Sequence, residues 1–107
     1  MSSGVFDSEK GKTLVSALLS LKTSKEVERF LRDLLTEAET REFANRFAAA
    51  QMLESGVSYT KIAENTGMSS TTIARISKWL NGALGGYKLA ISRLHHTHTE
   101  PVQAGKI

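Results

Sequence analysis

The sequence predicts an all-α protein of about six helices, and three observations support this fold class. Apolar residues recur at spacings of three and four through most of the 107 residues. The only proline is Pro101, so no residue in the body of the chain forbids helix. No segment of useful length alternates apolar and polar residues in the way that a half-buried strand requires.

The first three predicted helices occupy the first half of the chain. One runs from about Ser8 to Lys22, and Thr23 with Glu26 then forms a capping-box pattern that opens the second. An apolar stripe at helical spacing follows, made of Val27, Phe30, Leu31, Leu34 and Leu35. Thr36 and Glu39 repeat the capping box before a third, alanine-rich helix that ends near Glu54, ahead of Gly56.

Three shorter helices are predicted in the second half, over 58–65, 69–81 and 86–94. Residues 1–8 are expected to form a flexible N-terminal arm, residues 9–94 one helical domain, and residues 95–107 a disordered tail without periodicity.

The segment 58–80 carries the functional signal, because it meets the requirements of a helix-turn-helix. Ala63 is a small residue where the first helix would meet the second, and Gly67 tolerates a turn with positive φ. Apolar residues fall where the two helices must be held together, namely Ile62, Met68, Ile73 and Ile76. Each feature is common alone, and their joint spacing is not.

The second helix of this motif has an outer face suited to the major groove of DNA. Thr71, Ala74, Arg75 and Lys78 share that face, which contains no acid and no bulky apolar group. Backbone N–H groups at the start of this helix suit a phosphate. The expected DNA-binding residues are Thr60, Lys61, Ser69, Ser70, Thr71, Thr72, Ala74, Arg75 and Lys78. The alternative interpretation of this face is an ordinary solvated surface.

Charge and composition agree with a nucleic-acid partner and disfavour other classes. Residues 1–40 carry a net charge of −1 and residues 41–93 a net charge of +4. The chain has no cysteine, which excludes disulfides and cysteine-based zinc sites. No apolar stretch could span a bilayer and no signal peptide is visible, so a cytoplasmic protein is expected.

No catalytic or cofactor site is expected. No nucleophile–base pair or phosphate-binding glycine loop stands out, which makes an enzyme an unfavoured interpretation. His95, His96 and His98 match no common metal-ligand spacing, so we expect no metal site and no cofactor.

The sequence resembles the tryptophan repressor superfamily over roughly residues 34–80. The resemblance lies in Leu34-Leu35-Thr36 before a helix with Glu39, Arg41-Glu42 and Arg46, in the spacing of Ser58, Ile62, Gly67, Ile73, Arg75 and Leu80, and in the order of helices. It implies an intertwined homodimer in which the N-terminal helices of two subunits interlock. It also implies a regulator of transcription, most simply a repressor, that reads double-stranded DNA at a palindromic site.

The resemblance further implies a ligand pocket, but the residues there differ from the family pattern. The two arginines that hold tryptophan in the best-known members align with Arg46 and Arg75. The family's glycine and serine, however, align with Ile76 and Trp79, which share one flank of the helix with Thr72. Two large apolar side chains and an indole cannot occupy one cavity at protein packing density. We therefore expect Ile76 and Trp79 to fill the pocket and tryptophan not to act as corepressor.

Two other functions remain open from the sequence. The helix-turn-helix could bind another protein within a transcription complex instead of DNA. Alternatively, a different small ligand could act through Arg46 and Arg75.

Overall fold

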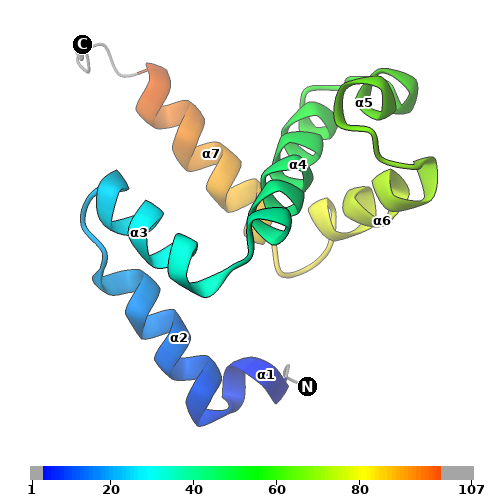
Figure 1. Ribbon diagram of the computed structural model, residues 1–107. Coiled ribbons are helices and arrows are strands. Elements are labelled where there is room, and N and C mark those ends of the chain that lie inside the picture. Colours follow the sequence, from blue (N-terminus) through cyan, green and yellow to red (C-terminus); the bar gives the residue numbers. More distant parts are fainter. Residues whose placement is uncertain (1–3, 100–107) are drawn as a thin grey trace. The chain divides into compact units, whose positions relative to one another are not determined.

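A computed structural model describes residues 4–99, with side chains as far as residue 95. This part of the chain contains helices and no strand, which confirms the all-α prediction (Figure 1). Its seven helices are α1 (Gly4–Asp7), α2 (Glu9–Ser20), α3 (Ser24–Leu34), α4 (Glu37–Glu54), α5 (Tyr59–Thr66), α6 (Ser70–Leu80) and α7 (Gly86–Thr99).

The two ends of the described chain differ from the sequence prediction. Helix α1 occupies residues 4–7, within the segment predicted as an N-terminal arm. Helix α7 continues to Thr99, beyond the predicted end at Leu94. Residues 100–107 of the predicted tail and residues 1–3 of the predicted arm lie outside the described residues.

Side-chain caps fix where the helices begin, as the sequence predicted. At α4 the capping box is reciprocal: the N–H of Thr36 donates to Glu39 Oε1 at 2.9 Å, and the N–H of Glu39 donates to Thr36 Oγ1 at 3.0 Å. At α3 only half of the box forms. Thr23 Oγ1 accepts from the Glu26 N–H at 3.1 Å, whereas Glu26 Oε1 accepts from the N–H of Lys22, one residue before the cap.

The chain divides into two compact units between Thr40 and Arg41. In the first unit, residues 4–40, α1 packs against the start of α2. A Cβ at Gly11 would overlap the carbonyl oxygen of Val5, so only glycine allows this close approach. Ser8 fixes the corner, since its hydroxyl donates to the Val5 carbonyl and accepts from the Gly11 N–H.

The second unit, residues 41–99, contains the hydrophobic core of the described residues. Its helices α4 to α7 bury one cluster, made of Ala49, Ala50, Ile62, Ile73, Ile76, Leu80 and Ile91. Two alanines at the centre of α4 are fully buried, which allows the helices around them to approach closely. Phe47 and Tyr87 pack beside this cluster with ring centroids 6.4 Å apart.

Within residues 4–99, no helix is both long enough and apolar enough to cross a membrane.

Candidate nucleic-acid interface

The helix-turn-helix predicted over residues 58–80 is formed by α5, α6 and the turn between them. Ser58 caps α5 by accepting from the N–H of Lys61 at 3.2 Å, and Ser69 caps α6 by accepting from the N–H of Thr72 at 3.2 Å. Gly67 ends α5 at a φ of +77°, and its N–H donates to the Ala63 carbonyl at 2.8 Å. The predicted turn glycine is therefore in the left-handed conformation that the motif requires.

The turn is held by side-chain hydrogen bonds as well as by the glycine. The hydroxyl of Thr66 donates to the Ile62 carbonyl at 2.7 Å and accepts from the Met68 N–H at 3.2 Å. Because this hydroxyl is partly buried, both bonds satisfy polar groups that water reaches poorly. They fix the path of the chain between the two helices.

Apolar packing holds the two helices against the rest of the second unit. Ile62, Ile73 and Ile76 are the largest fully buried side chains among the described residues. Ala63 and Met68 are half-buried against the same cluster. These five residues are the ones to which the sequence assigned the contact between the two helices, and each of them is buried or half-buried.

The outer face of α6 is exposed and basic. Thr71, Ala74, Arg75 and Lys78 are all exposed, and α6 contains no acidic residue. Of the other expected contact residues, Thr72 is half-buried, whereas Thr60, Lys61, Ser69 and Ser70 are exposed.

The cations of this surface are not neutralised by the protein itself. Within the part of the chain that the structure describes, Lys61, Arg75 and Lys78 form no ion pair. In contrast, Arg46 pairs with Glu42 and Lys88 with Glu54 elsewhere in the same unit. Helix α6 and the start of α5 therefore present uncompensated positive charge, which suits a polyanion.

The two arginines aligned with the family's ligand site have different surroundings. Arg46 Nη2 donates to Glu42 Oε2 at 2.9 Å, and its guanidinium lies 5.4 Å from the centroid of the Phe43 ring. Arg75 lies on the exposed face of α6. Sequence reasoning did not identify Glu42 and Phe43 as partners of Arg46, although their spacings of four and three along α4 indicate the contact.

The expectation that Ile76 and Trp79 together fill a pocket needs correction for the single chain. Ile76 is 1% exposed and belongs to the core, but Trp79 is 53% exposed. Trp79 lies about 60° from Ile76 around the helix axis, because three residues advance an α-helix by about 300°, roughly 60° short of a full turn. That step carries its side chain past the edge of the core, so within one chain the indole fills no cavity.

Tyr59 is a residue that the sequence analysis did not assign to the interface. It follows the cap Ser58 in the first turn of α5, next to Thr60 and Lys61, and it is 42% exposed. A phenol hydroxyl at this place is a further donor for a backbone phosphate. The signal for it was an aromatic residue directly after an N-cap, outside the apolar stripe.

A metal site is not formed by the side chains that the structure describes, since no three His, Cys, Asp or Glu residues gather there. The side chains of His96 and His98 lie outside the described part.

The chain is similar to known proteins in both sequence and fold. A family model described as "Trp repressor protein" matches residues 9–95. An uncharacterised protein of Bacillus subtilis, YerC, is 40% identical over 87 residues, which cover 81% of this chain and 84% of that protein. The crystal structure of a TrpR-like protein from Eubacterium eligens matches with a TM-score of 0.82 at 34% identity, covering 87% of this chain and 96% of that chain. The chain therefore belongs to the Trp repressor family, a family of helix-turn-helix DNA-binding regulators.

Proposed function

We propose that this protein is a sequence-specific transcriptional regulator, a repressor, that binds a palindromic DNA site as a homodimer without tryptophan as corepressor. The observation that carries this proposal is the outer face of α6. It is exposed, contains no acid and presents Arg75 and Lys78 without intramolecular partners among the described residues.

Each group on this face has a contact that it can make in a major groove. Arg75 and Lys78 can donate to guanine or to phosphate, and the methyl group of Ala74 can touch a thymine methyl. The hydroxyl of Thr71 can bond a base edge or the backbone. Around them, Thr60, Lys61 and Ser70 supply exposed donors for positioning on phosphates. The Ser69 hydroxyl already donates to Thr72 Oγ1 at 3.1 Å, so Ser69 contributes as the cap that orders the start of α6.

The core behind the face supports recognition without a ligand. The apolar residues on the inner side of α6, Ile73, Ile76 and Leu80, are at most 3% exposed. Their packing against residues of α4, α5 and α7 fixes the position of α6. Ile76 occupies core volume where the family has glycine, and Arg46 is already engaged with Glu42 and Phe43. These features argue against an indole bound between Arg46 and Arg75.

A homodimer would place two helix-turn-helix motifs on one duplex. We call this motif, residues 58–80, the reading head, and its second helix, α6, the reading helix. Two-fold symmetry predicts half-sites about one helical turn apart, roughly 34–36 Å. The exposed apolar side chains of the first unit, such as Leu19 at 80% exposure, are consistent with a surface that a second subunit covers.

The decisive experiment selects bound sequences from a random DNA pool and then measures affinity for the selected site against salt. We expect a palindromic site and a steep fall in affinity with rising salt. The double variant Arg75→Ala/Lys78→Ala should lose site-specific binding. Its plot of log affinity against log salt concentration should be less steep by about one unit of slope for each lost phosphate contact. Addition of millimolar tryptophan should leave the wild-type affinity unchanged.

The matched control is Lys10→Ala/Lys12→Ala, which removes the same charge from exposed positions of α2. This control should retain the selected site. Equal losses in both double variants would mean that only net charge matters, and no selected sequence at all would favour a protein-interaction module. A tryptophan-dependent rise in affinity would overturn the ligand-independent mechanism.

A further inference from the structure

Trp79 is the only tryptophan in the chain, and the described residues leave it uncovered. It lies in the last turn of α6 at 53% exposure, beside the buried residues Ile76 and Leu80. Among the side chains of residues 4–95, its ring makes no aromatic contact and its indole N–H has no hydrogen-bond acceptor. A large aromatic side chain with an unpaired polar atom at a domain edge is characteristic of interface anchors.

The first unit lacks the core that would keep its helices folded by themselves. Among its described residues only Gly11 is buried, and its apolar side chains remain accessible to solvent. Short isolated helices are marginal in water, so these helices need apolar partners from outside the unit. A second copy of the chain supplies such partners in a small homodimer.

The first unit also contains a cavity of about 400 Å³ at the junction of α3 and α4, lined by Arg32, Leu35, Glu37 and Thr40. The residues around it match what an indole needs. A guanidinium such as that of Arg32 attracts the face of a tryptophan ring, and Leu35 offers an apolar wall. Thr40 Oγ1 donates to the Thr36 carbonyl at 3.0 Å and keeps lone pairs that can accept from an indole N–H.

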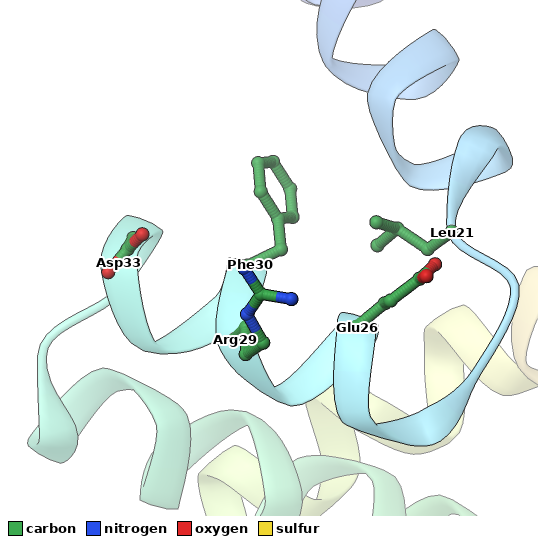
Figure 2. A pocket seen from close by; sticks show the side chains of 5 residues that line it. All are labelled: Leu21, Glu26, Arg29, Phe30 and Asp33. Carbon is green, nitrogen blue, oxygen red and sulfur yellow. The ribbon is translucent and has the colours of Figure 1, made fainter.

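A second cavity of the same unit fits an indole less well. It measures about 310 Å³ and lies between the end of α2 and α3, where Leu21 and Phe30 project into the same space (Figure 2). Its lining has two carboxylates, Glu26 and Asp33, against one guanidinium, that of Arg29, whereas the α3–α4 cavity has one carboxylate against one guanidinium. Carboxylates repel the negative face of an aromatic ring. This cavity therefore provides an internal control.

We propose that Trp79 of one copy inserts its indole into the α3–α4 cavity of a second copy. The inference rests on the proposed dimeric regulator and specifies the contact that orients its reading heads. In the dimer, a side chain of the protein would then connect α6 to the other subunit, so that the reading helix is held without a small molecule.

The sequence makes this contact directly measurable, because it has one tryptophan and no cysteine. Chains that keep Trp79 are mixed with chains that carry Trp79→Phe and Ala38→Cys, the cysteine bearing a nitroxide quencher at an exposed position beside the cavity but outside its lining. Donor and quencher then belong to different copies. The matched control places the same label at Lys22→Cys, an exposed position next to Leu21 of the other cavity. We expect loss of most Trp79 emission with the label at position 38 and retention of most of it with the label at position 22, at equal dimer fractions by sedimentation.

A second measurement uses the dimer dissociation constant. Trp79→Ala should raise it roughly thirtyfold, the effect of losing a hot-spot tryptophan worth about 2 kcal/mol. Leu84→Ala, at a fully exposed position in the α6–α7 turn, serves as the control for a lost apolar side chain. Circular dichroism verifies that both variants keep the helical fold.

Three results would overturn the inference: equal quenching from both label positions, quenching only when the label is on the chain that carries Trp79, or an unchanged dissociation constant in Trp79→Ala. DNA binding by the wild-type protein is measured in parallel. Selective quenching without DNA binding would contradict only the proposed function. DNA binding without selective quenching would contradict only this contact.

Discussion

The two units of this chain are both helical, yet they differ in what holds the helices together. The second unit buries seven apolar residues in one cluster, with Ile62 and Ile73 at 0% exposure. The first unit buries only Gly11 among its described residues and leaves Leu19 and Phe6 at 80% and 58% exposure. The contrast indicates that the second unit, which includes the helix-turn-helix, is held by a core of its own, whereas the first unit has no comparable core among its described residues.

The largest effect that tests this contrast is expected from the core of the reading head. Ile73→Ala leaves a cavity at a fully buried position and should lower the free energy of unfolding by about 2–5 kcal/mol. Leu19→Ala, in the first unit, should change the free energy of unfolding of the dilute chain by less than about 0.5 kcal/mol. Urea unfolding at low and high protein concentration measures both. Similar losses in the two variants at low concentration would show that the first unit has a core of its own.

A smaller effect is expected at the turn of the reading head. Gly67 has a φ of +77°, and the left-handed conformation costs a residue with a Cβ roughly 1–2 kcal/mol. A Cβ at this position meets no atom within 4 Å, so the cost of Gly67→Ala should be purely conformational.

Gly86→Ala is the matched control, since its Cβ also meets nothing within 4 Å and its φ is not positive. That change should stabilise the protein by about 0.4–1 kcal/mol through the unfolded state. Thermal unfolding of the two variants should therefore shift in opposite directions. A shift in the same direction would contradict the left-handed conformation of Gly67.

The smallest global effect is expected at the most severe local clash. In Gly11→Ala the new Cβ would overlap the Val5 carbonyl oxygen, which should displace α1 from α2. Because α1 has no buried residue, and because alanine favours helix over glycine by up to about 1 kcal/mol, the free energy of unfolding should change by no more than about 1 kcal/mol. Amide hydrogen exchange of residues 5–12 should become faster, because the packing of α1 against the start of α2 is lost. A larger global loss would mean that α1 supports more than its own contact.

Local signals in the sequence were sufficient for α2 to α6 and for the helix-turn-helix, although not for α1 or for the end of α7. The caps Thr36, Ser58 and Ser69 and the glycine at position 67 act through neighbours within four residues, so their roles are visible without tertiary structure. The same holds for the buried and exposed faces of α6, which follow from helical periodicity. The shift of the Glu26 carboxylate to the Lys22 N–H was not predictable, because it depends on the path of the chain before the cap.

The sequence by itself determined an all-α chain, a helix-turn-helix with its turn glycine and an acid-free basic face, because these depend on spacing along the chain. Only the tertiary structure decided how far the core extends around α6. It buried Ile76 and left Trp79 at 53% exposure, although both belong to the same flank in sequence. The physical reason is that exposure depends on what other helices cover, and periodicity gives the direction of a side chain without its neighbours.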